Sequence, residues 1–81
     1  MYFVYVLRSK RNNKRYIGYT SKDVQKRLKE HNFGDSKYTK GHRPYRLTYK
    51  EEFADRLSAR SREKYLKSGI GREFIKRLIP P

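Results

Sequence analysis

The sequence has 81 residues, no cysteine and a formal net charge of +14, with 22 Lys and Arg residues against 8 Asp and Glu. A chain of this length buries only about 60–65% of its unfolded surface, so we expect one domain over residues 1–81 with a small core. The lack of cysteine excludes a disulfide partner and a thiolate metal site. No segment has the apolar length of a membrane-spanning helix or the order of a signal peptide, and we therefore expect a cytoplasmic protein.

The excess of basic residues predicts a polyanionic partner. A compact body of this charge attracts polyanions and steers them toward its surface. Nucleic acid is the first candidate and an anionic membrane surface is the second. Simple solubility or association with the ribosome would explain the same composition, so the charge alone leaves these alternatives open.

Residues 2–20 read as a β-hairpin. Two runs rich in aromatic and β-branched residues, YFVYVL at 2–7 and YIGYT at 16–20, flank the turn-forming sequence RNNK at 11–14. Alternation separates the side chains of the first run onto two faces, with Phe3, Tyr5 and Leu7 on one and Tyr2, Val4 and Val6 on the other. Gly18 leaves space inside the second strand for another backbone or a ligand. This pattern alone favours the simpler interpretation, in which the tyrosines are amphipathic residues of two strands that nucleate the sheet.

A helix is expected over residues 22–32, with Thr20 or Ser21 as its N-cap. Val24 and Leu28 are four residues apart and mark the buried stripe of this helix. The same spacing brings two polar side chains together beside that stripe, those of Arg27 and His31.

Residues 36–44, SKYTKGHRP, form a basic loop in which an aromatic residue lies among cations. Such a mixture suits phosphate contacts combined with stacking on bases. The candidate nucleic-acid-binding residues of this loop are Lys37, Tyr38, Lys40, His42 and Arg43. A plain surface loop would have a similar composition, so both interpretations stay open.

Residues 45–53 read as a third strand, in which alternation places Tyr45, Leu47 and Tyr49 on one face. Two helical segments follow in the pattern. With antiparallel hairpin strands, the order β-β-α-β-α-α predicts an α+β fold, in which a small three-stranded antiparallel sheet is flanked by helices.

The first of these helices, over residues 54–67, carries a carboxylate on its inward stripe. Ala59 and Leu66 define the stripe, and Glu63 lies between them at helical spacing. A buried carboxylate is costly unless it is paired, hydrogen-bonded or metal-bound, so Glu63 is expected to pair with a nearby Arg or to bind a metal. The sequence SGIG then breaks the helix, and a final helix over residues 72–79 turns three apolar side chains inward, Phe74, Ile75 and Leu78.

Five elements of known type occur in order along the chain. Phe3-Val4-Tyr5 stands at the position of a Gly-Ile-Tyr motif, and Tyr16-Ile17-Gly18 is a Tyr-Ile-Gly motif. The helix DVQKRLKEH supplies an Arg-x-x-x-His pair, and the segments KYTKGHRPYRLTYKEEF and ARSREKYLK follow it. With these features the chain resembles the GIY-YIG nuclease family, in particular its small stand-alone bacterial branch. The family's metal-binding glutamate falls on Glu63.

The resemblance implies an endonuclease that hydrolyses phosphodiester bonds in DNA with one divalent metal ion, Mg²⁺ or Mn²⁺, held by Glu63. Arg27 then offsets the charge of the phosphate. Any of three side chains is able to accept the proton of the attacking water, those of Tyr5, Tyr16 and His31. With no appended recognition domain, weak specificity or selection of branched, flapped or nicked duplexes in repair or recombination is expected.

In this interpretation, Gly18 makes room near Tyr16 for the following helix or for the scissile phosphate. Phe3 replaces the glycine of the first motif, and no asparagine follows Asn32, although many nucleases of the family use a late one. A catalytically weak nucleic-acid-binding module of the same fold is therefore the alternative function. A basic protein that docks on an acidic partner is a third.

Overall fold

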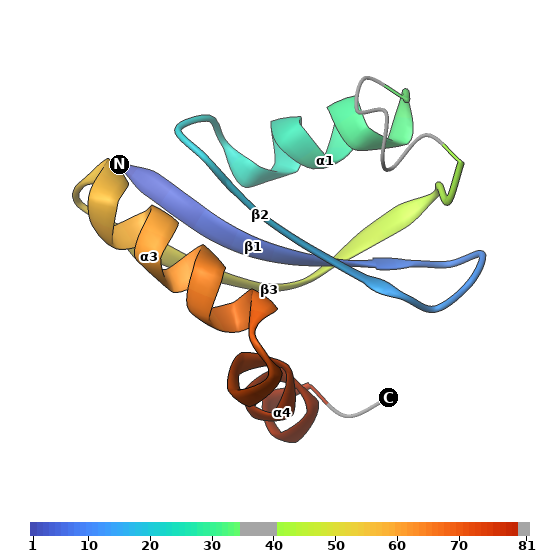
Figure 1. The fold of residues 1–81 in the computed structure, drawn as a ribbon. Coiled ribbons are helices and arrows are strands. Elements are labelled where there is room, and N and C mark those ends of the chain that lie inside the picture. Colours follow the sequence, from blue (N-terminus) through green and yellow to red (C-terminus); the bar gives the residue numbers. More distant parts are fainter. Residues whose placement is uncertain (35–40, 80–81) are drawn as a thin grey trace.

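The computed structural model describes residues 1–34 and 41–79. Within these residues, a three-stranded antiparallel sheet with the strand order β2-β1-β3 combines with three helices (Figure 1). The strands are β1 (Tyr2–Ser9), β2 (Arg15–Thr20) and β3 (Tyr45–Phe53), and the helices are α1 (Val24–Asn32), α3 (Arg56–Lys67) and α4 (Gly69–Leu78). The expected α+β fold and the order β-β-α-β-α-α are confirmed. None of the helices in the described ranges is long and apolar enough to cross a membrane.

Helices cover both faces of the sheet, with α1 on one face and α3 and α4 on the other (Figure 1). The core between the sheet and the last two helices consists of Val4, Val6, Ile17, Ala59, Leu66 and Ile75. The core under α1 consists of Tyr5, Leu7, Val24 and Tyr45. The alternation expected for the first strand is therefore confirmed, because successive residues of β1 belong to different cores.

The β1–β2 hairpin forms as the sequence predicts. Its turn contains Asn13 with a φ of 65°, a left-handed conformation that asparagine tolerates better than most residues. β2 pairs only with β1 and is an edge strand of the sheet. The register places Tyr5 of β1 opposite Gly18 of β2, which determines the geometry of the site described below.

The alternation expected for the third strand is wrong beyond Thr48. The ladder between β1 and β3 shifts register there by one residue, as in a β-bulge. Such a shift exchanges the two faces of the strand, because the side-chain period of a strand is two residues. Tyr45 and Leu47 accordingly pack under α1, whereas Tyr49 packs in the opposite core.

Helices α1 and α3 each begin two residues later than expected, directly after an aspartate. The Asp23 carboxylate accepts hydrogen bonds from the backbone N–H groups of Gln25 and Lys26, so Asp23 is the N-cap of α1 in place of Thr20 or Ser21. Asp55 caps α3 in the same way.

The last helix begins earlier than expected, because the SGIG sequence belongs to it. Ser68 caps α4, and Gly71 lies inside its first turn. A Cβ atom at Gly71 would lie 1.9 Å from the carbonyl oxygen of Tyr65, so the glycine serves the close approach of α4 to α3. Leu78, expected to point inward, is 44% exposed, and Ile79 packs against the core instead.

Candidate active site

The Tyr5 side chain lies directly over Gly18, on the face of the sheet that α1 covers. A Cβ atom at Gly18 would be 2.6 Å from the Tyr5 hydroxyl oxygen and 2.8 Å from its Cζ. Only glycine therefore leaves the phenol its path toward the edge of the sheet. The expectation for Gly18 is corrected, since Tyr5 fills the space that was assigned to the following helix or a phosphate.

Tyr5 makes a buried hydrogen bond with His31 of α1. The Tyr5 hydroxyl oxygen lies 3.0 Å from His31 Nε2, and the two side chains are 2% and 0% exposed. Burial raises the pKa of Tyr5 to about 12, and the neighbouring Arg27 guanidinium acts in the opposite direction. The phenol is therefore protonated at neutral pH, and neither side chain of the pair reaches the surface.

Tyr16 completes a cluster of three rings. Its ring centroid lies 6.4 Å from that of Tyr5 and 5.0 Å from that of His31, the latter with an edge-to-face geometry. Tyr16 is half-buried, whereas the other two rings are inside the core. The cluster thus fixes the position of one partly exposed tyrosine ring.

Arg27 lies one helical turn before His31 and is held by an acidic neighbour. Its Nη1 is 2.7 Å from one oxygen of Glu30, whose other oxygen is 2.9 Å from Lys22 Nζ. Hydrogen bonds from Lys22 and Arg27 lower the pKa of Glu30 to about 2. A phosphate bound by Arg27 must share this guanidinium with Glu30 or displace it. Glu30 was not among the expected site residues, although its i, i+3 spacing from Arg27 is the signal for this pair.

Glu63 comes to the same edge of the sheet from the other side, on α3. Its side chain is 15% exposed, and its Oε2 lies 3.2 Å from Nζ of Lys67, so its partner is a lysine and not an arginine. After burial, which has the largest effect, the charges of Tyr16 and Glu63 contribute to the raised pKa of Tyr5. Lys67, the partner of Glu63, lines the same groove as Tyr16, described below, so Glu63 lies near the ring cluster although it belongs to a different layer.

Glu63 fits a metal ion that is held by a single protein carboxylate. No group of three His, Cys, Asp or Glu residues able to hold a metal occurs in residues 1–34 and 41–79. Mg²⁺ typically binds through one or two carboxylates and takes its other ligands from water and substrate phosphates. The donor set here therefore suits Mg²⁺ or Mn²⁺ bound jointly with a phosphate.

Only two of the five candidate nucleic-acid-binding residues in the basic loop are among the described residues. Lys37, Tyr38 and Lys40 lie outside the described residues. His42 and Arg43 are exposed, and His42 Nδ1 lies 3.0 Å from Asn12 Nδ2 in the hairpin turn. The role of these residues in binding nucleic acid stays a prediction.

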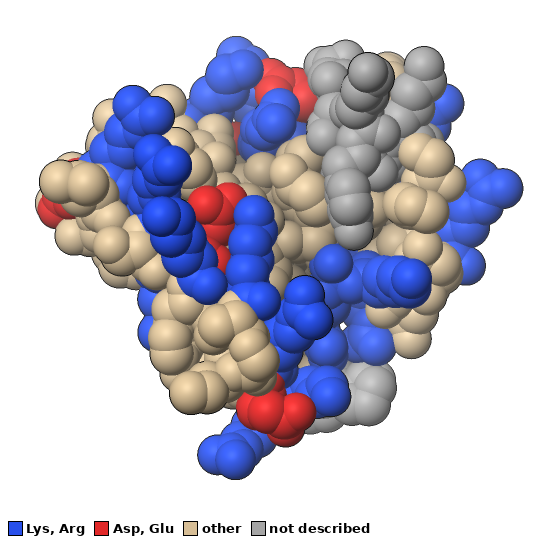
Figure 2. Space-filling model, in the orientation of Figure 1, with Lys and Arg blue, Asp and Glu red and all other residues tan. Residues whose placement is uncertain are grey.

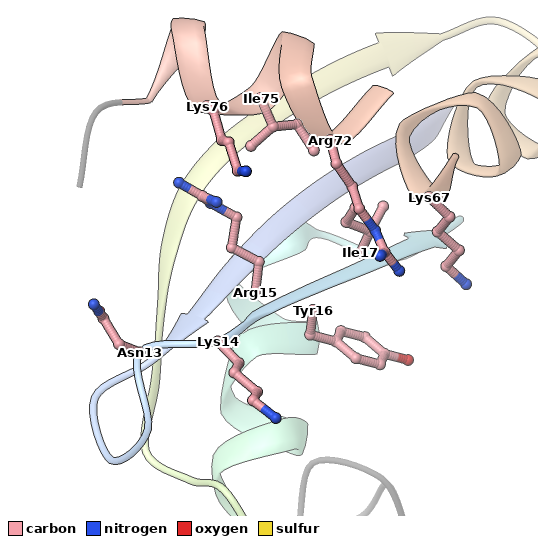
Figure 3. A pocket seen from close by; sticks show the side chains of 9 residues that line it. All are labelled: Asn13, Lys14, Arg15, Tyr16, Ile17, Lys67, Arg72, Ile75 and Lys76. Carbon is pink, nitrogen blue, oxygen red and sulfur yellow. The ribbon is translucent and has the colours of Figure 1, made fainter. Parts of the chain in front are cut away.

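A groove that sequence reasoning missed borders the cluster on the opposite side of β2. It has a volume of about 710 Å³, and Figure 3 shows the side chains that line it from the hairpin turn, β2, α3 and α4. Five of these are cations, Lys14, Arg15, Lys67, Arg72 and Lys76, and Tyr16 also lines the groove. Two features of the sequence could have indicated this groove. They are the pair of basic residues directly before Tyr16 and the basic residues of the last helix.

The family of this chain follows from a match of its sequence to the GIY-YIG catalytic domain over residues 1–73. The chain belongs to the GIY-YIG nuclease family. Within this GIY-YIG domain, the expected motif residues Tyr5, Tyr16, Arg27 and His31 come together on one side of the sheet edge, and Glu63 approaches from the other.

Relatives of this GIY-YIG protein are small proteins named UPF0213. One from Clostridium perfringens is 43% identical over 68 residues, which cover 83% of this chain and 71% of that protein. YazA of Bacillus subtilis is 43% identical over 67 residues, covering 82% and 66%, and a Staphylococcus haemolyticus protein is 37% identical over 76 residues, covering 93% and 90%. None of these names states an activity.

The fold of the GIY-YIG protein is similar to the solution NMR structure of a UPF0213 protein from Bacillus halodurans. The two chains are 35% identical and superpose with a TM-score of 0.57. The similarity covers 96% of this chain and 85% of the other. It therefore includes the sheet and the helices on both of its faces.

Proposed function

We propose that this protein is a divalent-metal-dependent endonuclease that hydrolyses phosphodiester bonds in DNA. Its specificity is weak or directed to branched, flapped or nicked structures, in repair or recombination. The observation that carries the proposal is the convergence of side chains from both faces of the sheet on the edge strand β2, namely Tyr5, Tyr16, Arg27, His31 and Glu63. The family supports the class of reaction, and the burial of each group supports its role.

Burial supports Tyr16 over Tyr5 and His31 as the proposed base. His31 and Tyr5 are 0% and 2% exposed, so they act through the cluster as positioning residues. Tyr16 is half-buried and lines the groove, which makes it the group that accepts a hydrogen bond or a proton from the attacking water. The edge-to-face contact with the His31 ring, at 5.0 Å between centroids, holds the Tyr16 ring in place.

Two further side chains complete the proposed site. Arg27 binds the non-bridging oxygens of the scissile phosphate, with its guanidinium shared between the phosphate and Glu30. Glu63 holds the divalent ion, which when bound stabilises the charge on the leaving oxygen. Lys67 then contacts a phosphate oxygen when its bond with Glu63 is exchanged for metal binding.

The test is a cleavage assay with nicked, flapped and branched duplexes and single strands, in Mg²⁺ or Mn²⁺. Tyr16→Phe is expected to reduce the rate by about 100-fold or more, as for loss of a positioned general base. Glu63→Gln is expected to abolish cleavage while retaining the shape of the side chain. Tyr19→Phe makes the same chemical change at the other face of β2 and should leave the rate within about threefold of wild type. Equal rates for wild type and Glu63→Gln on every substrate would exclude the nuclease function.

The second candidate function, a catalytically weak nucleic-acid-binding module, is favoured by the ion pair of Arg27 with Glu30. A carboxylate at 2.7 Å competes with a phosphate for this guanidinium, but it does not affect binding at other basic residues. This function predicts binding to all the substrates in a gel-shift assay and no cleavage of any. The cleavage assay and the gel-shift assay together separate the two candidates.

A further inference from the structure

The groove between β2 and α4 has cationic walls and an apolar floor. Ile17 and Ile75 form the floor and are 8% and 1% exposed. Figure 3 shows Arg15 and Lys76 pointing toward one another at one end of the groove, while Arg72 extends toward the Tyr16 end. The groove therefore begins at the candidate catalytic tyrosine and leads away from it between two rows of positive charge.

Among the described residues, three of these five cations have no acidic partner. Lys67 and Lys76 pair with acidic residues of their own helices at 3.2 and 3.5 Å. Within residues 1–34 and 41–79, no acidic side chain forms an ion pair with the other three cations of the groove, Lys14, Arg15 and Arg72. Figure 2 shows Lys and Arg side chains gathered over this part of the surface, between the hairpin and the last two helices.

The sheet itself places like charges next to one groove residue, Arg15. Arg8 of β1 lies opposite Arg15 of β2 and opposite Arg46 of β3. Like charges directly opposite each other on neighbouring strands are destabilising, so a bound anion would relieve their repulsion. Burial and the neighbouring Arg8 lower the pKa of Arg15, in agreement with this crowding.

Arg15, which lines the groove, also has a buried donor without a hydrogen-bond partner among the described residues. Its Nη2 donates a hydrogen bond to the carbonyl oxygen of Ile79 at 3.2 Å, which holds the guanidinium in place. Its Nε is buried and has no hydrogen-bond partner among the described residues. Guanidinium groups bind phosphate oxygens with two or more N–H groups at once.

We propose that this groove binds the sugar–phosphate backbone of an unpaired strand adjacent to the scissile phosphate. The apolar floor suits deoxyribose, and the cationic walls suit the phosphates that alternate with it. A volume of about 710 Å³ is typical of sites that enclose small ligands. It suits a single strand of a few nucleotides, whereas a double helix presents its phosphates on a wide convex surface. The inference rests on the proposed nuclease function and assigns it a substrate class, DNA with a single-stranded tail beside the cleaved bond.

The test measures binding without metal, so that it does not depend on catalysis. Fluorescence anisotropy with EDTA compares a duplex that carries an eight-nucleotide single-stranded tail with the same duplex made blunt. The groove variant is Arg72→Gln combined with Lys76→Gln. The matched control is Lys64→Gln with Arg77→Gln, which removes the same charge from exposed positions of α3 and α4 that do not line the groove.

The groove variant is expected to bind the tailed duplex about tenfold more weakly, and the slope of log K against log salt should fall by about 1.4, for two single-strand phosphate contacts. The control variant should stay within about threefold of wild type on both duplexes. Equal weakening by the two variants, or no preference of wild type for the tail, would overturn the proposal. Thermal melting of each variant establishes that it is folded.

The same measurements separate this proposal from the nuclease function. If the wild-type protein prefers the tailed duplex, the groove variant loses this preference and neither protein cleaves DNA, the proposal for the groove stands and the nuclease function is excluded. If wild type and the groove variant cleave DNA at the same rate, and wild type binds both duplexes with equal affinity, the nuclease function stands and the proposal for the groove is excluded.

Discussion

The two sides of strand β2 differ in burial and in charge. On the side of α1, Tyr16 belongs to a cluster of rings in which His31 is completely buried, and Gly18 makes room for the Tyr5 ring of this cluster. On the side of α3 and α4, Arg15 and Ile17 line an open groove rich in cations. Successive residues of one strand thus serve different surfaces, because strand side chains alternate between the two faces of the sheet.

This difference separates two tasks that are hard to combine. Holding a phenol at a defined position requires packing that excludes water, as burial does for Tyr5 and His31. Holding a polyanion requires charges that remain hydrated until the ligand arrives, since burying unpaired cations is costly. An edge strand satisfies both requirements, because a substrate at the edge can contact both faces at once.

The largest change in stability is expected on the groove side, for a variant that disturbs the close packing of α4 on α3. In Gly71→Ala, the new Cβ would lie 1.9 Å from the Tyr65 carbonyl oxygen, so α4 must move away from α3. We expect a loss of about 3 kcal/mol in the free energy of unfolding, measured by urea denaturation. Gly69→Ala in the same helix meets nothing within 4 Å and should change stability by less than about 1 kcal/mol. Similar losses for the two variants would contradict this packing.

An intermediate effect is expected on the ring side. Gly18→Ala places a Cβ 2.6 Å from the Tyr5 hydroxyl oxygen, which must shift and lengthen its bond with His31. We expect about 1–3 kcal/mol of destabilisation and a larger loss of cleavage than of tail binding. Gly41→Ala, where a Cβ meets nothing within 4 Å, is the control. If Gly18→Ala weakened binding to the tail as strongly as the groove variant does, the two sides would not be independent.

The smallest expected effect concerns Glu30, which joins Lys22 and Arg27 at the surface of the ring side. Its pKa falls from 4.5 to about 2 on folding, so the carboxylate stabilises the fold fully above about pH 4.5 and loses this effect as the pH falls toward 2. The melting temperature of Glu30→Gln should lie slightly below that of wild type at pH 7, and the gap should close toward pH 2. A gap that does not change with pH would show that the ion pairs do not contribute.

Local sequence patterns are sufficient to predict several features of the structure without any contact between distant residues. The two faces of β1 and the position of Arg27 and His31 on one helical face follow from spacings of two and four residues. The hairpin turn follows from the turn-forming residues at 11–14, among which Asn13 adopts the left-handed conformation. The position of Glu63 between Ala59 and Leu66 follows for the same reason. These features depend on neighbours in the chain, and the sequence by itself determined them.

Contacts between distant residues decided the rest. The register shift at Thr48 depends on how β3 meets β1. The SGIG sequence does end α3, at Lys67, but the next helix begins at Gly69 and not at Arg72, with Gly71 packed closely on α3. The path of Tyr5 over Gly18 follows from strand register, and the cationic groove exists only because α4 folds back beside β2. The Tyr-Ile-Gly motif could be recognised in the sequence, but only the tertiary structure showed that its tyrosine stands between a buried ring cluster and a charged groove.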